Sequence, residues 1–472
     1  MKPAISAVYR TTPLAGSKIG DISRNFINHP LFAQPTSFLC EDNPFRRPLR
    51  PQDLPTIDLT RPLPQSEFAS NAALLGQRLL ATIYETDLLF LPTRMDSRRR
   101  EDMRAFYDDD FRQSGELLRP TLERQLFGFL EDEITVSGNW TLESFRAYAA
   151  DAVAQANRGA SEVVRTIRQA RDPGAAATEF LVQLASDFLS EASAMARNVL
   201  GNYGPAQSGL FTILIDEYGY GVPKQKHSTI FEATLASRGL DNRPHAYWQF
   251  YLPSSLALVN YFHFVSKNHN HFGRYVGALL YTEATLAEAN RQQSDMLRTI
   301  FGTDVDTLYF DEHVQIDPHH GKMALERVIV PLVARCGNGL LGDIVRGFEE
   351  FRLLQQLADQ DLIDQIKFAD RLFKAPDSGA LCTTQPGLWD GPGVLRFDEP
   401  KGEISVPHLH DVDEIFELTE GEIEFTVGPA HAITLKAGEA VLIPARRLHG
   451  TKVLSERCRY RVAEAVGYGL VA

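Results

Sequence analysis

Three histidines near the C-terminal end of the sequence have the residue type and spacing of metal ligands. His408 and His410 lie two positions apart in a segment of β character, and His449 lies in a later one. Residues two apart in an extended strand point to the same face, so His449 can complete a face of three imidazoles. Glu414 could add a fourth ligand. Three neutral imidazoles with open positions beside them suit Fe(II) and oxygen chemistry, and they also admit Mn, Ni or Zn.

These histidines belong to a longer spaced pattern. Its eight positions are Gly402, His408, His410, Glu414, Gly421, Gly438, Pro444 and His449. A lone histidine is more often a hydrogen-bonded core residue, but chance would supply each of these positions at only ~5% or less. The pattern resembles the double motif of the cupin family, jelly-roll barrels that hold one mononuclear metal. Arg446 stands where that motif usually has a glycine.

A second set of potential ligands lies in a segment of helical character. The stretch EHVQIDPHHG places His313, Asp317 and His320 at positions i, i+4 and i+7. On a helix these positions fall within about 60° of one another and form one stripe. Pro318 lies among them, and a proline inside a helix costs roughly 3 kcal/mol because it removes a hydrogen bond. We therefore expect the helix to be interrupted at Asp317, with Pro318 starting a new segment that becomes ordered when metal binds.

Carboxylates in other helical segments decide between a metal site and a merely polar helix face. Glu191, Glu217 and Glu283 are each flanked by apolar residues. An isolated buried carboxylate is costly unless it is paired or bound to a metal. Carboxylates and imidazoles that converge from several helices are the arrangement of di-iron carboxylate proteins. We therefore predict a di-iron site.

The order of these residues is similar to that of the haem-oxygenase-like di-iron oxidases. The E-x-x-H pairs of ferritin-like proteins are absent, whereas the resembling family has Glu, Glu with a later His, Glu, and then H-x-x-x-D-x-x-H. The resemblance implies seven iron ligands in this chain, namely Glu191, Glu217, His227, Glu283, His313, Asp317 and His320.

The predicted elements define a multidomain α + β protein. We expect a helical N-terminal domain in residues 1–150, which we assign to dimerisation, and a haem-oxygenase-like all-α di-iron domain in residues 151–373. A stretch rich in helix breakers, residues 374–393, is typical of a linker. Short β-type runs separated by turns then predict a cupin β-barrel in residues 394–472.

Net charge and cysteine spacing indicate which classes of partner and which cell compartment to expect. The 472 residues carry a formal net charge of −13, and no block of basic residues stands out. We therefore expect no nucleic-acid partner and no membrane partner. The four cysteines lie far apart without a C-x-x-C pair, which fits a reducing cytoplasm.

Nearly the whole chain resembles the N-nitrosourea-forming enzymes of streptozotocin biosynthesis. The likeness includes the stretches EDNPFRRPLRP, FLSEAS, YGPAQS, IDEYGYGV and YVGALLYTE besides both ligand sets. It implies an enzyme that hydroxylates two guanidine nitrogens of Nω-methyl-L-arginine at the di-iron site, with O2 as cosubstrate and an external reductant. A single iron held by His408, His410 and His449 would then rearrange the product to an N-nitrosourea. A homodimer is likewise implied.

Several alternatives stay open at this point. The chain could hydroxylate another amino acid or guanidine, with a different cupin reaction or none, or it could be a non-enzymatic iron sensor. Tyr460 could hydrogen-bond the cupin substrate or serve only in packing. Arg446 and Arg447 could face a substrate carboxylate or lie in solvent.

Overall fold

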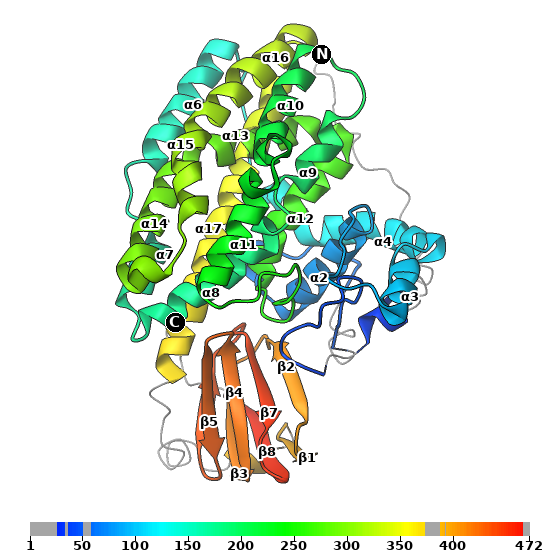
Figure 1. The fold of residues 1–472 in the computed structure, drawn as a ribbon, viewed down its shortest axis with the longest axis vertical. Coiled ribbons are helices and arrows are strands. Elements are labelled where there is room, and N and C mark those ends of the chain that lie inside the picture. The colour runs from blue at the N-terminus through cyan, green and yellow to red at the C-terminus, as the bar shows by residue number, and fades with distance from the viewer. Residues whose placement is uncertain (1–25, 34–35, 51–57, 373–387, 392, 466–472) are drawn as a thin grey trace.

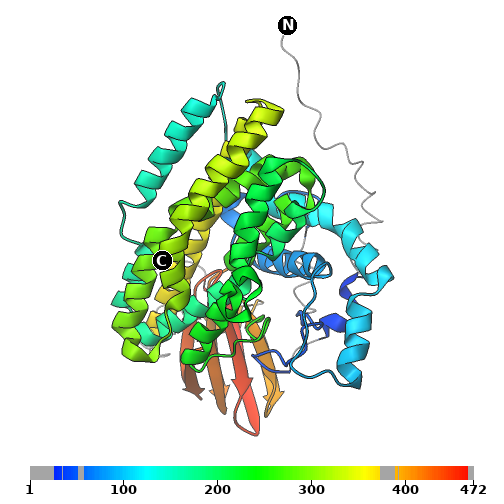
Figure 2. The ribbon, with the colours of Figure 1, turned by 45° about the horizontal axis from the view of Figure 1, so that its top comes forward.

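A helical body and a β unit make up the computed structural model, which describes residues 26–33, 36–50, 58–372, 388–391 and 393–465. The two sheets lie at one end of the helical body (Figure 1, Figure 2). Most of the predicted linker, residues 374–393, and Cys382 fall outside the described residues. Within the described residues, no helix is both long enough and apolar enough to cross a membrane.

Helices dominate the chain from residue 71 to residue 372. The α-helices are α2 (Asn71–Glu85), α3 (Ser97–Phe106), α4 (Asp109–Phe127), α5 (Leu130–Glu133), α6 (Leu142–Ala156), α7 (Glu162–Gln169), α8 (Pro173–Phe188), α9 (Ser193–Ala196), α10 (Pro205–Glu217), α11 (His227–Ser237), α12 (Pro253–Lys267), α13 (Phe272–Thr285), α14 (Ala287–Phe301), α15 (Leu308–Met323), α16 (Val330–Cys336) and α17 (Leu340–Leu372). A π-helical segment, η9 (Ala324–Ile329), joins α15 to α16.

Local sequence signals explain where several of these helices begin. Asp172 accepts a hydrogen bond from the amide of Ala175 at 2.9 Å, and Pro173 occupies the first position of α8, where its missing N–H costs nothing. Thr141 and Ser144 form a reciprocal capping box at the start of α6. These signals place α8 so that its C-terminal end reaches the stretch that contains Glu191.

One apolar core crosses the boundary that we expect at residue 150. Residue 150 lies inside α6, and a single cluster of buried side chains runs from Phe26 through Phe145 to Leu354. The N-terminal helices α2 and α4 therefore pack into the same body as α12 and α13 rather than around a core of their own. The division at residue 150 stays a prediction, which this shared core does not favour.

The C-terminal unit is built from two antiparallel four-stranded sheets, as the β-type runs predict. The strands are β1 (Leu395–Pro400), β2 (Ile404–His408), β3 (Glu414–Glu420), β4 (Glu422–Gly428), β5 (His431–Lys436), β6 (Ala440–Ile443), β7 (His449–Val453) and β8 (Arg457–Glu464). One sheet has the order β1-β8-β3-β6 and the other has the order β2-β7-β4-β5. The predicted α + β fold with a C-terminal β unit is confirmed.

Helix α17 connects the two parts physically. It runs through the helical body and ends against the sheets (Figure 1). Phe368 and Leu372, at its C-terminal end, are buried in one cluster with Phe416 and Phe425 of the β unit. The core of the β unit therefore includes side chains from the helical body.

The predicted interruption of the helix at Asp317 is wrong. Helix α15 continues from Leu308 to Met323 with Pro318 inside it. A proline there leaves the carbonyl of Val314 without its usual donor four residues later, but the helical φ of proline lets the backbone continue. Irregular backbone starts only at Ala324, where η9 begins.

Candidate metal centres

The three C-terminal histidines come together at the edge between β2 and β7. His408 ends β2, His449 begins β7, and the two residues are paired across the ladder. His410 lies in the turn that follows β2. The ring centroids are 4.8 Å apart for His408 and His410, 4.5 Å for His408 and His449, and 5.4 Å for His410 and His449. One nitrogen of each ring lies within 4.8 Å of the others, so a single ion could contact all three.

Backbone carbonyls fix which nitrogen of two of these rings is free. The Nδ1–H of His408 donates to the carbonyl of Val406 at 2.8 Å, and the Nδ1–H of His449 donates to the carbonyl of Arg447 at 2.9 Å. Each Nε2 is then left as a lone-pair donor for a metal, which is the usual arrangement of histidine ligands.

Electrostatics keep these imidazoles neutral. Burial, followed by the charge of Arg50, lowers the pKa of His408 well below its ordinary value and that of His410 to about 4. Burial, followed by the charge of His410, lowers the pKa of His449 to about 3. Three neutral imidazoles with converging nitrogens fit a divalent transition metal.

Glu414 lies near this group but outside it. Its Oε1 is 3.5 Å from Nδ1 of His410, and burial raises its pKa to about 7. Tyr460 lies in β8, where its hydroxyl donates to Oε1 of Glu399 at 2.9 Å and its ring stacks on Phe416. These contacts account for Tyr460 as a packed residue with a satisfied hydroxyl.

The two arginines beside His449 have different surroundings. Arg447 is buried, where its Nη2 lies 3.1 Å from Oδ1 of Asp361 and its Nη1 donates to the Asp361 carbonyl at 3.0 Å. It therefore joins the β unit to α17 and does not lie in solvent. Arg446 is more exposed and donates to the carbonyl of Ser66.

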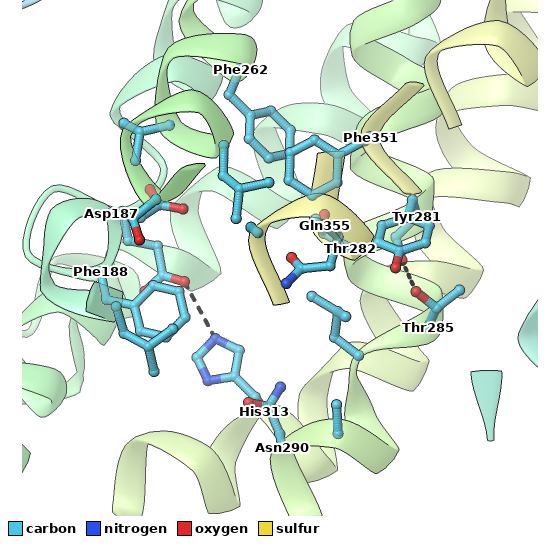
Figure 3. A pocket seen from close by; sticks show the side chains of 18 of the residues that line it. Asp187, Phe188, Phe262, Tyr281, Thr282, Thr285, Asn290, His313, Phe351 and Gln355 are labelled. Atoms are coloured by element: carbon cyan, nitrogen blue, oxygen red, sulfur yellow. Dashed lines mark hydrogen bonds and ion pairs between the residues drawn. The ribbon is translucent and has the colours of Figure 1, made fainter. Parts of the chain in front are cut away.

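In the helical body, four predicted ligands meet in one group. Glu191, Glu217, His227 and His313 each offer one atom within 4.8 Å of the others. Nδ1 of His227 is 2.6 Å from Oε2 of Glu217, and Nε2 of His313 is 3.5 Å from Oε1 of Glu191. Figure 3 shows His313 and the ion pair that it makes, at the wall of a cavity.

A second group shares one carboxylate with the first. Glu217, Glu283 and His320 also lie within 4.8 Å of one another. Nδ1 of His320 is 3.2 Å from Oε1 of Glu217 and 3.2 Å from Oε2 of Glu283. Glu217 therefore belongs to both groups, while the first group has two imidazoles of its own and the second has one.

One predicted ligand lies outside both groups. Asp317 is buried and near them, but its Oδ2 accepts a hydrogen bond from Asn290 at 3.4 Å. Sequence reasoning missed Asp216, whose Oδ2 is 2.9 Å from Nε2 of His320. The available signal was its position beside Glu217 in the stretch IDEYGYG.

Packing and hydrogen bonds hold the ligands in place. The Tyr309 hydroxyl donates to Oε1 of Glu191 at 2.7 Å, and Nδ1–H of His313 donates to the Tyr309 carbonyl at 2.7 Å. Gly321 lets α15 approach α13, because a Cβ there would come within 2.9 Å of the Glu283 carbonyl oxygen. A larger residue at this position would push the neighbouring ligand of α15 away from Glu283.

The buried carboxylates of this site need positive charge beside them. Despite burial, hydrogen bonds to carboxylates raise the pKa of His313 to about 10 and that of His320 to about 12. Burial also raises the pKa of Glu283, and Oε2 of Glu191 is buried without a hydrogen-bond partner among the described residues. Protons thus balance the buried carboxylates in the metal-free protein, and metal ions could replace them. The donor set fits two such ions.

A cavity of about 520 Å³ opens on this site. Aromatic side chains, including Phe188, Phe262 and Phe351, form much of its wall (Figure 3). The predicted ligands that also line it are Glu191, Glu217, Glu283, His313 and Asp317. The volume suits an amino-acid-sized ligand.

Comparisons with known proteins match both halves of this description. Residues 178–356 match a family described as iron-containing redox enzymes, and residues 395–463 match the cupin domain family. The sequence is 45% identical over 458 residues to the nitrosourea synthase of Streptomyces achromogenes subsp. streptozoticus, covering 96% of this chain and 97% of that protein. A solved cupin-2 domain containing protein from Shewanella frigidimarina NCIMB 400 covers 20% of this chain and 97% of its own, with 21% identity and a TM-score of 0.14.

Proposed function

Because this chain belongs to the nitrosourea synthase family, we propose that it converts Nω-methyl-L-arginine into an N-nitrosourea at two separate iron sites. The chain is a non-haem iron oxidase. The substrate, the division of the reaction between the sites and the need for O2 and an external reductant are the proposed part. A homodimer formed through the N-terminal helices is a further expectation, and exposed leucines such as Leu89 and Leu91 near α2 agree with it.

In the proposed first step, two guanidine nitrogens are hydroxylated in the cavity of the helical body. The two irons, when bound, supply the activation of O2 with electrons from the reductant. The carboxylates offset the positive charge of oxidised iron, and the apolar wall excludes water from the reacting nitrogens. Asp317, on whose carboxylate the charges of His313 and His320 act, is the seventh ligand that the resemblance implies. The residues that would hold the irons are Glu191, Glu217, His227, Glu283, His313 and His320.

In the proposed second step, the hydroxylated product is rearranged at the three-histidine site. A single iron, when bound, supplies the oxidation there. Because only His408, His410 and His449 would hold this iron, coordination positions would remain open for a substrate with several hydroxylated nitrogens. Glu414, whose pKa burial raises to about 7, could hold or receive a proton next to His410.

The observation that carries this proposal is the presence of two unlike ligand sets in one chain. The acid-rich set suits two irons with a shared carboxylate, and the neutral set suits one. A sensor would need only one of them, which counts against the non-enzymatic alternative. An N-hydroxylase with a different cupin reaction differs only in its product, so product analysis decides between the two enzymes.

The test loads the protein anaerobically with Fe(II), adds Nω-methyl-L-arginine, a reductant and O2, and identifies the products by mass spectrometry. We expect an N-nitrosourea from the unaltered protein. We expect dihydroxylated methylarginine to accumulate with His408→Ala, and unchanged substrate with His313→Ala. Unchanged methylarginine in the iron-loaded unaltered protein would overturn the proposal, and a hydroxylated product without a nitrosourea would favour the N-hydroxylase.

A further inference from the structure

The cavity beside the helical metal site has a wall of unusual charge. Among the described residues that line it there is no lysine and no arginine. The lining also contains acidic residues that belong to neither metal group, among them Asp187 and Asp359. A wall of this composition offers an anion no lysine or arginine side chain, but it can bind cations.

Asp187 lies next to the metal ligands. It occupies the last turn of α8, four residues before Glu191, and the negative charge of Glu191 repels its carboxylate. No described residue forms a hydrogen bond or ion pair with its carboxylate. Figure 3 shows the Asp187 side chain at the cavity wall beside the contact that His313 makes. A half-buried carboxylate that no described side chain pairs with favours a cationic ligand group at this position.

Asp359 lies on a different wall of the same cavity. It belongs to α17, where Nε2 of Gln355 donates to its Oδ1 at 2.8 Å. Burial, followed by the charge of Asp359, raises the pKa of Tyr281 of α13. Burial raises the pKa of Asp359 itself to about 6. No cationic side chain among the described residues pairs with it, so a ligand cation would supply the missing partner.

We infer that Asp187 and Asp359 are the specificity residues of this cavity, which bind the two cationic groups of an arginine-type substrate. Asp187 accepts hydrogen bonds from the guanidinium beside the metal site, and Asp359 accepts them from the α-ammonium group. The apolar wall formed by Phe262 and Phe351 lies along the methylene chain. This inference rests on the proposed function, because it takes its substrate class from there.

The geometry assigns the guanidinium to Asp187 because the reacting nitrogens must lie beside the metal ligands. Asp187 is close enough to Glu191 for the two carboxylates to interact, whereas none of the predicted metal ligands acts on Asp359. A planar guanidinium can also donate two parallel hydrogen bonds to one carboxylate, which fixes its orientation. The substrate carboxylate is left to neutral donors, since no lysine or arginine is present among the described lining residues.

The test measures ligand binding by calorimetry with the anaerobic iron-loaded enzyme, so that no turnover is needed. The variants are Asp187→Asn and Asp359→Asn. The matched control is Asp364→Asn, also on α17, whose carboxylate accepts a similar bond from Gln360 at 2.9 Å but lies outside the cavity wall. We expect each cavity variant to weaken binding of Nω-methyl-L-arginine by about 10- to 100-fold, and the control to leave it unchanged.

Two ligand analogues assign each carboxylate to its cation. Nω-methyl-L-citrulline replaces the guanidinium by a neutral urea, and we expect Asp187→Asn to change its affinity by no more than roughly twofold. For the methylarginine analogue that lacks the α-amino group, we expect Asp359→Asn to change the binding affinity by a similarly small factor. The unaltered enzyme should bind both analogues more weakly than methylarginine, which tests cation binding without any variant.

The outcomes separate this inference from the proposed function. If methylarginine binds as expected but no nitrosourea forms, the proposed function fails and the cation site stands. If a nitrosourea forms but both cavity variants bind methylarginine as Asp364→Asn does, the inference is overturned. Equal affinity of the unaltered enzyme for methylarginine and methylcitrulline would also overturn it. The iron content of each variant, measured alongside, shows that the metal site is intact.

Discussion

At the scale of single residues, the partner of each histidine sets its chemistry. His408 and His449 donate to backbone carbonyls and stay neutral, whereas His313 and His320 face carboxylates that raise their pKa values to about 10 and about 12. The same residue type is therefore a neutral imidazole in the β unit, whereas in the metal-free helical body it carries an additional proton that a metal ion would displace.

A buried carboxylate outside both metal groups predicts a pH effect on stability. Glu179 of α8 is 2% exposed, packs against Gly428, and burial raises its pKa to about 8 from an ordinary value of 4.5. The folded protein thus keeps a proton that the unfolded chain releases, so this stabilisation is full below pH 4.5 and is lost as the pH rises toward 8.

Glu179→Gln should remove that dependence. Relative to the unaltered protein, we expect the variant to gain about 1–3 kcal/mol in its free energy of unfolding between about pH 5 and about pH 8, measured by urea denaturation. Glu456→Gln, at an exposed site, should gain nothing. The same difference between variant and unaltered protein at both pH values would contradict this account of Glu179.

At the scale of elements, helix α15 carries ligands on both sides of an internal proline. The helix is continuous, yet Pro318 withholds one hydrogen bond between His313 and His320. We expect the amides of residues 313–320 to exchange with solvent faster in the iron-free protein than in the iron-loaded one, because metal would hold both halves together. Hydrogen exchange followed by mass spectrometry measures this directly.

A second internal proline provides the control for this experiment. Pro120 lies inside α4, a helix that contributes none of the predicted metal ligands. Pro318→Ala should reduce the effect of iron on exchange in α15, because it restores the missing backbone donor, whereas Pro120→Ala should leave that effect as it is. Equal protection of α15 with and without iron would contradict metal-dependent ordering.

At the scale of the whole molecule, α17 contacts the surroundings of both candidate metal sites. Its Gln355 and Asp359 lie on the cavity wall, and its Gln365 reaches the β unit. The side chain of Gln365 is fully buried, donates to the carbonyls of Val427 and Leu448 at 2.8 and 2.9 Å, and accepts from the Leu448 amide at 2.9 Å. Leu448 immediately precedes the third cupin histidine, so α17 positions a predicted ligand of the cupin iron.

Loss of these three hydrogen bonds should act on one metal site only. We expect Gln365→Leu to weaken iron binding in the cupin by about 10- to 100-fold, the range typical for residues that orient metal ligands, while the helical site keeps its iron. Iron content per chain after dialysis, compared with His449→Ala, measures this. Gln360→Leu, on the exposed face of α17, is the control. Unchanged iron content in Gln365→Leu would show that α17 does not position His449.

Local spacing predicted which neighbouring residues of each candidate site lie together. Close spacing keeps the rings of His408 and His410 together, although β2 ends at His408, and helical periodicity places His313 and His320 on one stripe. These properties depend on residues a few positions apart, so the sequence by itself determined them. The same local rules failed at Pro318, where tertiary packing keeps the helix intact although local propensity disfavours it.

Only the tertiary structure decided how residues far apart in the chain share space. It made Glu217 common to two groups, left Asp317 with Asn290, and set Asp216 against His320. It also joined the β unit to α17 through a buried arginine, and gathered a cavity wall without lysine or arginine among the described residues. Such contacts depend on how helices and sheets pack, and spacing along the chain carries no information about distances between elements.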